Sequence, residues 1–152
     1  MTGSDDVQAV VTDDSQFMRR MIADILEDGG ITVVAEVGDG QAALEAVQDH
    51  DPDVVTMDIQ MPVMDGVEAT ERIMAEHPTP ILVLSAYADE SADVTFRALE
   101  HGAVDFFAKP GGEVSMEMQR HREQLVEKVL AVSSAHVSGR DEHEKPSMRG
   151  GN

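Results

Sequence analysis

The sequence DVVTMD at residues 53–58 joins a short, β-branched run to an aspartate at its end. Runs of this length and composition favour β-strands. A similar run at residues 7–12 is followed directly by Asp13 and Asp14. Segments with helical periodicity alternate with such runs along the chain, which is typical of repeated βα units. The sequence therefore predicts an α/β fold with a parallel sheet.

Five βα units are predicted. Strands are expected at residues 7–12, 32–37, 53–57, 81–84 and 103–107, with helices from Ser15 to the Gly29-Gly30 pair and at residues 41–50, 67–76, 92–100 and 113 to about 132. The first helix is expected to bury one stripe of side chains, made up of Phe17, Met18, Met21, Ile22, Ile25 and Leu26. In the second helix Ala43, Leu44 and Val47 are expected to face inward.

A single domain of ordinary size suits 152 residues with 41% hydrophobic content. Residues 1–6 are interpreted as an N-terminal extension and residues 7–132 as the folded domain. Residues 133–152 are rich in Ser, Gly, His and charge, and we expect a flexible tail or interdomain linker there. The N-terminus lacks signal-peptide character and the longest apolar runs are of strand length. A cytoplasmic protein without membrane insertion is therefore expected.

The formal net charge is −19, with only three lysines against eight arginines and no cysteine. Such a surface repels nucleic acid, which is therefore excluded as a partner. A halophilic origin explains the charge, because the Debye length falls to ~3 Å at 1 M salt and self-repulsion is then screened. The alternative is an acidic surface that docks a basic partner.

Polar residues follow the predicted strands where those strands end. They are Asp13 and Asp14 after the first strand, Asp58 after the third, Ser85 after the fourth and Lys109 after the fifth. In an open parallel sheet, ligands bind beyond these carboxyl ends. Two carboxylates ~4 Å apart repel by roughly 4 kcal/mol at an effective dielectric near 20, so a cluster of acids implies a bound metal or a proton. The pattern suggests a Mg²⁺-assisted phosphoryl acceptor.

These residues give the chain a resemblance to the receiver domains of bacterial and archaeal response regulators, over about residues 7–131. The resemblance rests on the following segments: Asp13-Asp14, Asp58 to Met61-Pro62, Met64-Asp65-Gly66, Ser85-Ala86 and Lys109-Pro110. It implies a flavodoxin/CheY-like, doubly wound αβα sandwich with strand order 2-1-3-4-5. It also implies a Mg²⁺ ion and phosphorylation of Asp58 by a phosphohistidine on a sensor kinase.

The expected roles have physical reasons. Mg²⁺ prefers hard oxygen ligands in an octahedron, so Asp14, Asp58, Asp13 directly or through water, and the Gln60 carbonyl make a plausible shell. An Asp58 oxygen is expected to attack phosphorus, while the metal and Lys109 neutralise charge on the phosphoryl oxygens. The protein would thus catalyse its own phosphorylation and dephosphorylation.

Three further residues are assigned to the site. The Ser85 hydroxyl is expected to contact a phosphoryl oxygen, although a strand-end hydroxyl bonded to backbone is an alternative. Ala86 beside it leaves the site open. Phe106 occupies the place of the family's switch aromatic, and its ring is expected to rotate when phosphate draws Ser85 inward. The alternative is a permanently buried core ring.

A narrower resemblance is to the regulatory half of the chemotaxis methylesterase CheB. It rests on residues 14–20, 53–58, 61–66 and 102–112. It implies a CheA-like histidine kinase as phosphodonor and a C-terminal methylesterase domain as output. These residues contain no Gly-x-Ser-x-Gly nucleophile elbow, so methylesterase activity is not expected within them.

Two other functions stay open. One is a stand-alone, CheY-like receiver that binds a motor or another output protein. The other is a Mg²⁺-dependent hydrolase of small phosphates. Turnover separates a receiver from a hydrolase, because a receiver forms a persistent acyl phosphate and a hydrolase releases phosphate steadily.

Overall fold

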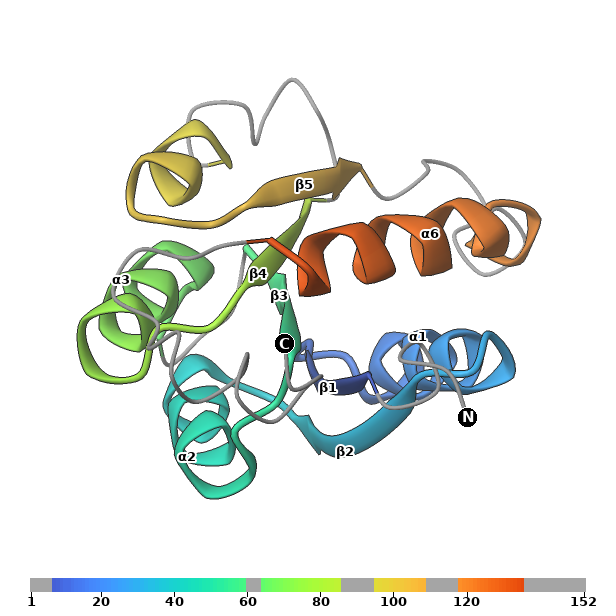
Figure 1. The fold of residues 1–152 in the computed structure, drawn as a ribbon, viewed down its shortest axis with the longest axis horizontal. Coiled ribbons are helices and arrows are strands. Elements are labelled where there is room, and N and C mark those ends of the chain that lie inside the picture. The colour runs from blue at the N-terminus through green and yellow to red at the C-terminus, as the bar shows by residue number, and fades with distance from the viewer. Residues whose placement is uncertain (1–6, 60–63, 86–94, 109–117, 136–152) are drawn as a thin grey trace, which may run out of the picture.

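The computed structural model describes residues 7–59, 64–85, 95–108 and 118–135. Five parallel strands form one sheet in the order β2-β1-β3-β4-β5 (Figure 1). The strands are β1 Gln8–Thr12, β2 Thr32–Val37, β3 Val54–Asp58, β4 Ile81–Ser85 and β5 Asp105–Ala108, and the helices are α1 Gln16–Asp28, α2 Gly40–His50, α3 Gly66–Glu76 and α6 Arg122–Ser133. Residues 95–100 and 118–120 are also helical. The predicted fold class and strand order are confirmed.

Helices cover both faces of the sheet (Figure 1). On one face, α2, α3 and residues 95–100 pack on alternate strand residues, in a core that includes Val10, Val55 and Met57. On the other face, α1 and α6 pack on a second core that includes Val11 and Leu82. Strands with apolar residues on both faces are typical of a sheet covered on both sides. Ala43, Leu44 and Val47 of α2 are buried as predicted.

The limits of α1 follow from its capping residues. The Ser15 side chain accepts a hydrogen bond from the Met18 amide at the start of the helix. At the end, Gly30 has a φ of +92°, and the Ile31 amide donates to the Leu26 carbonyl at 3.0 Å. The Gly30 amide also donates to the Glu27 carbonyl, which completes a Schellman motif. The predicted glycine stop is confirmed.

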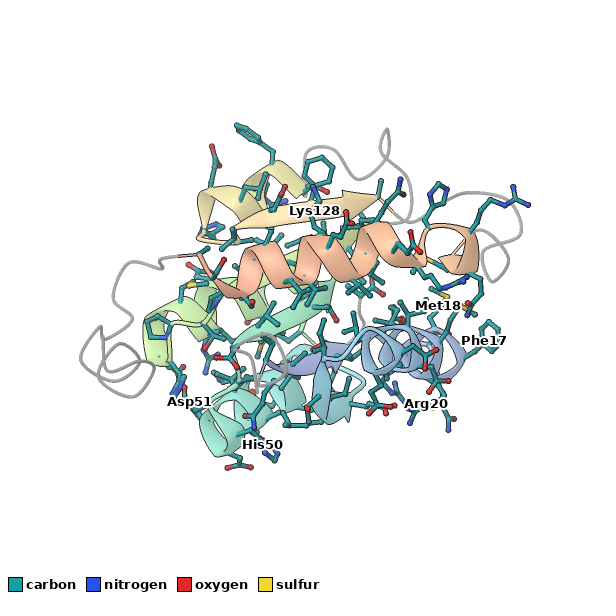
Figure 2. The ribbon with its side chains drawn as sticks, turned by 45° about the vertical axis from the view of Figure 1, so that its right-hand side comes forward. Phe17, Met18, Arg20, His50, Asp51 and Lys128 are labelled. Atoms are coloured by element: carbon teal, nitrogen blue, oxygen red, sulfur yellow. The ribbon has the colours of Figure 1, made fainter. Side chains whose placement is uncertain are left out.

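The prediction that Phe17 belongs to the buried stripe of α1 is wrong. Its side chain is 63% exposed, whereas Met18, Ile22, Ile25 and Leu26 are buried. Consecutive helical residues are rotated by about 100°, so Phe17 lies well away from the face that Met18 shares with those residues. Figure 2 shows Phe17 at the outside of α1.

Strand β5 begins two residues later than predicted. The helix at residues 95–100 ends in a second Schellman motif, in which Gly102 has a φ of +120° and the Ala103 amide donates to the Ala98 carbonyl at 3.0 Å. Ala103 therefore still belongs to the helix end. Pairing with β4 starts at Asp105, which is in register with Leu82.

The edge strand β5 carries a small polar network. The Phe106 amide donates to the Asp105 carboxylate at 2.8 Å, and Lys128 of α6 donates to the other oxygen of that carboxylate at 3.1 Å. Figure 2 shows Lys128 on the side of α6 nearest β5. Both charged groups are more than one-third exposed, so the ion pair itself contributes ~0–1 kcal/mol. The pair links Asp105, the first residue of β5, to α6.

Helix α6 depends on Leu125, whose side chain is fully buried against the α1 face of the sheet. We expect Leu125→Ala to lower the free energy of unfolding by about 2–5 kcal/mol, because it removes apolar contacts and leaves a cavity. Leu130→Ala is the matched control, since Leu130 is only partly buried. Chemical denaturation of both variants measures the difference, and equal losses would contradict the packing described.

Within the described ranges, no helix has the length and apolar content needed to cross a bilayer.

Candidate functional site

Three carboxylates meet at the carboxyl edge of the sheet. One ligand oxygen from each of Asp13, Asp14 and Asp58 lies within 4.8 Å of the other two. Asp13 and Asp58 are buried, at 1% and 6% exposure, and Asp14 is exposed. Strands β1 and β3 are neighbours in register, Thr12 beside Met57, so the residues that follow Thr12 lie next to Asp58. The predicted clustering of these three aspartates is confirmed.

The donor set of this cluster is suited to a hard divalent cation. All three side chains offer carboxylate oxygens, the ligands that Mg²⁺ prefers, and the exposed Asp14 leaves a side open for water or substrate. Two of the acids are nearly inaccessible to solvent, so water screens their repulsion poorly. A cation bound at this position would relieve that repulsion.

Asp13 is held on several sides. Its amide donates to the Val37 carbonyl of β2 at 3.1 Å, and one of its carboxylate oxygens accepts a hydrogen bond from the Ser15 amide at 2.9 Å. Its backbone carbonyl accepts a hydrogen bond from Arg19 of α1 at 2.7 Å. The loop between β1 and α1 is thus fastened both to the neighbouring strand and to the helix that follows.

Asp58 is the last residue of β3, and the chain beyond it is closely packed. The Ile59 amide donates to the Leu84 carbonyl at 3.1 Å, and the Gly66 amide donates to the Ile59 carbonyl at 2.9 Å. A Cβ at Gly66 would lie 2.6 Å from the Asp58 carbonyl oxygen and 2.8 Å from the Ile59 Cα. Only glycine allows α3 to begin so close to the backbone of Asp58.

We expect Gly66→Ala to disturb both stability and the carboxylate cluster. The added methyl group would meet backbone atoms that have no free rotation, at a cost of about 1–3 kcal/mol in the free energy of unfolding. Gly30→Ala is the control, because its positive φ makes it destabilising while nothing lies within 4 Å of its Cβ position. Denaturation should show a loss for both variants, whereas only Gly66→Ala should weaken Mg²⁺ binding measured by calorimetry. Unchanged Mg²⁺ binding in Gly66→Ala would contradict the close approach.

Ser85 lies where the sequence predicted, at the carboxyl end of β4. It is the last residue of that strand and is 3% exposed. Asp58 is in register with Leu84, and Ser85 with Ala108 of β5. The register therefore brings the ends of β3, β4 and β5 to the same edge. Gln60, Ala86 and Lys109, which were also assigned to the site, lie outside the described residues.

Phe106 is 41% exposed on the edge strand β5, in register with Val83. The alternative of a permanently buried core ring is therefore wrong. Its neighbour Phe107 is partly buried and packs on the α1 and α6 core. The structure shows the Phe106 ring in one exposed position, and its rotation on phosphorylation stays a prediction.

Sequence reasoning missed Arg19 and the close approach of Gly66. Arg19 stands in the first turn of α1, where the helix dipole disfavours a cation. That misplaced charge was the signal available in the sequence. The approach of Gly66 to Asp58 depends on the path of the chain in three dimensions and has no local signature beyond the glycine.

Comparison with known proteins places this fold and site in a family. The response regulator receiver domain matches residues 9–121. The chain therefore belongs to the response regulator receiver domain family.

Individual relatives agree with this assignment. A protein-glutamate methylesterase/protein-glutamine glutaminase from Haloarcula marismortui is 60% identical over 97% of this chain and 42% of its own length. The response regulator domain of Thermotoga maritima CheB superposes with a TM-score of 0.79 and 37% identity, covering 86% of this chain and 98% of that one. A structure of a CheX-CheY-BeF3-Mg complex from Borrelia burgdorferi gives a TM-score of 0.70 at 26% identity, with 85% of this chain and 90% of that one covered.

The chain spans less than half the length of the methylesterase relative that it matches. The acidic composition and the haloarchaeal source of that relative together fit a halophilic protein.

Proposed function

We propose that this chain is the phosphoacceptor unit of a chemotaxis-type regulator, and that Asp58 receives a phosphoryl group from a histidine kinase in a Mg²⁺-dependent reaction. The observation that supports this most strongly is the cluster of Asp13, Asp14 and Asp58, one oxygen from each within 4.8 Å of the others, at the carboxyl edge of a receiver fold. Asp58 is the acceptor because it is the buried carboxylate at the end of the central strand β3.

Asp13, Asp14 and Asp58 would hold the Mg²⁺ ion, with the Gln60 carbonyl as the proposed fourth protein ligand. The bound ion supplies positive charge that offsets the repulsion between these acids and an incoming phosphoryl group. The Borrelia burgdorferi relative was solved with BeF3 and Mg, which supports the same combination of metal and phosphoryl mimic here.

Each side chain has a separate role in phosphoryl transfer. An Asp58 oxygen attacks phosphorus, the new oxygen–phosphorus bond forms, and the phosphorus–nitrogen bond to the donor histidine breaks. The Ser85 hydroxyl, at the end of the adjacent strand, donates to one phosphoryl oxygen, and Ala86 leaves room beside it. Lys109 follows Ala108, which is in register with Ser85, and provides the second positive charge.

The response is proposed to spread from β4 to β5. When Ser85 moves toward phosphate, Phe106 rotates from its exposed position into the space that Ser85 leaves. Phe96, Val104 and Phe106 all expose large apolar surface in the stretch of chain at residues 95–108. Rotation of the Phe106 ring would change this surface, which an output domain or partner can read.

The domain that the receiver would control is proposed from the names of the similar proteins. We place the receiver at residues 7–132, after a short extension at 1–6, and assign residues 133–152 to an interdomain linker, of which Ser133 still belongs to α6. The linker leads to a methylesterase domain of the kind named in the Haloarcula marismortui relative. A CheA-like kinase is the proposed donor, and the cytoplasm the proposed location.

Acetyl phosphate and Mg²⁺ provide the direct test. The purified chain is incubated with both, with acetyl phosphate plus a chelator, and with Mg²⁺ alone, and intact mass is then measured. We expect one added phosphoryl group only when donor and metal are both present. The adduct should be acid-stable and base-labile. Steady release of phosphate from generic phosphate esters, without a persistent adduct, would instead indicate a hydrolase.

A further inference from the structure

Arg19 makes a contact that its position in the helix does not explain. It lies in the first turn of α1, three residues after Gln16, where the positive end of the helix dipole makes a cation unfavourable. Its Nη1 atom reaches back to donate a hydrogen bond of 2.7 Å to the backbone carbonyl of Asp13. The side chain is half-buried. A charged donor this close to a carbonyl forms one of the stronger kinds of hydrogen bond.

The carbonyl that Arg19 contacts belongs to the peptide group that joins Asp13 to Asp14. Its orientation therefore affects two of the three clustered carboxylates. The Asp13 amide is bonded to Val37 of β2 and a carboxylate oxygen of Asp13 accepts from Ser15, and the hydrogen bond from Arg19 adds a further restraint on this loop.

The neighbouring chain leaves space for the guanidinium. A Cβ built on Gly38, the residue after β2, would lie 3.2 Å from the Arg19 Nη1 atom. The guanidinium thus lies between the loop after β1 and the residue after β2. Its next neighbour in sequence, Arg20, points elsewhere and pairs with Asp24, Glu27 and Glu36 on the outside of α1 (Figure 2).

We propose that Arg19 is a positioning residue for the metal site, which it arranges by fixing the peptide between Asp13 and Asp14 before the ion binds. This inference rests on the proposed function of the cluster as a Mg²⁺ site. A positioning role for Arg19 and a purely electrostatic role predict opposite changes in Mg²⁺ affinity when the Arg19 charge is removed. Removing a nearby positive charge should tighten Mg²⁺ binding if only Coulomb repulsion acted, whereas loss of positioning should weaken it.

The test compares Mg²⁺ affinity in four proteins by titration calorimetry in about 2 M KCl, where long-range charge effects are screened. They are the wild type, Arg19→Met, Arg19→Lys and Arg20→Met. We expect Arg19→Met to bind Mg²⁺ about tenfold more weakly, as found when outer partners of metal ligands are removed. Arg19→Lys should lie between Arg19→Met and the wild type, because lysine can donate to the carbonyl but lacks the planar fork. Arg20→Met removes the same charge one residue away and should bind like the wild type.

A second readout needs neither metal nor activity. In amide NMR spectra of the metal-free protein, Arg19→Met should shift the Asp13 and Ser15 amide resonances and speed their hydrogen exchange, and Arg20→Met should leave both unchanged. Circular dichroism checks that each variant is folded. If Arg19→Met does not fold, the comparison of Arg19→Lys with the wild type replaces it, and weaker Mg²⁺ binding is then the expected result.

The outcomes separate the two proposals. Wild-type protein that binds no Mg²⁺ would overturn the proposed function and this inference together. Wild-type protein that binds Mg²⁺, with equal or tighter binding in Arg19→Met, would overturn the positioning role alone. If Arg19→Met does not fold, equal or tighter binding in Arg19→Lys would do the same.

Discussion

Asp58→Asn is expected to reduce phosphoryl uptake from acetyl phosphate by at least about a hundredfold, to the background of the mass measurement. The substitution keeps the size of the side chain but removes the nucleophilic oxygen that forms the acyl phosphate. It also removes one of three negative charges from the cluster, so Mg²⁺ should bind more weakly. Intact-mass measurement after incubation with Mg²⁺ and acetyl phosphate gives the first result, and calorimetry gives the second.

Asp49→Asn is the matched control, because Asp49 is an exposed aspartate of α2, away from the sheet edge. It should accept phosphate as the wild type does. An adduct of undiminished yield in Asp58→Asn would show that another residue is the acceptor and would remove the proposed mechanism.

Lowering the salt concentration is expected to give the largest change in stability. The chain has 30 acidic against 11 basic residues, so its surface repels itself strongly when screening is lost. The Debye length grows from ~3 Å at 1 M to ~30 Å at 0.01 M salt. We expect a loss of about 3–5 kcal/mol between these conditions, a large share of the ~5–15 kcal/mol that holds a typical domain folded. Urea denaturation at a series of KCl concentrations measures it.

A neutral osmolyte separates screening from general stabilisation. Sucrose strengthens burial by exclusion from the protein surface but does not screen charge, so it should restore only part of the stability lost at low salt. A free energy of unfolding that is the same at about 0.01 M and 1 M salt would contradict a salt-adapted surface.

Most of the fold could be predicted because its signals are local. The β-branched runs that end at Thr12 and Asp58, and the glycine stop at Gly30, lie in single stretches of sequence, and the structure confirms all of them. Phe17 could not be placed from hydrophobicity alone. A first-turn residue has few helical neighbours to define its face, and packing against the sheet decides which face is buried. The start of β5 was misplaced because the hydrogen bond from Ala103 to Ala98 extends the end of the preceding helix.

The site was predictable to a similar degree. Acids after strands must meet if the sheet is parallel, which is why Asp13, Asp14 and Asp58 could be grouped before their distances were known. The hydrogen bonds that hold these aspartates in place could not be predicted from the sequence. An arginine in the first turn of a helix is unusual, but its bond goes to the backbone carbonyl of Asp13, a group that every residue possesses, so the sequence does not identify the acceptor.

The carboxylate of Asp105 has a consequence for how this protein behaves when concentrated. Strand β5 is the last in the sheet, and a free strand edge is where a foreign strand can attach and start a fibril. Here Asp105 of that strand and its partner Lys128 are both charged and more than one-third exposed. In a salt-rich solution the mutual repulsion of acidic chains is weakened, but covering these two charged groups with a foreign strand would still cost their hydration, so they protect the edge against polymerisation where net charge no longer does.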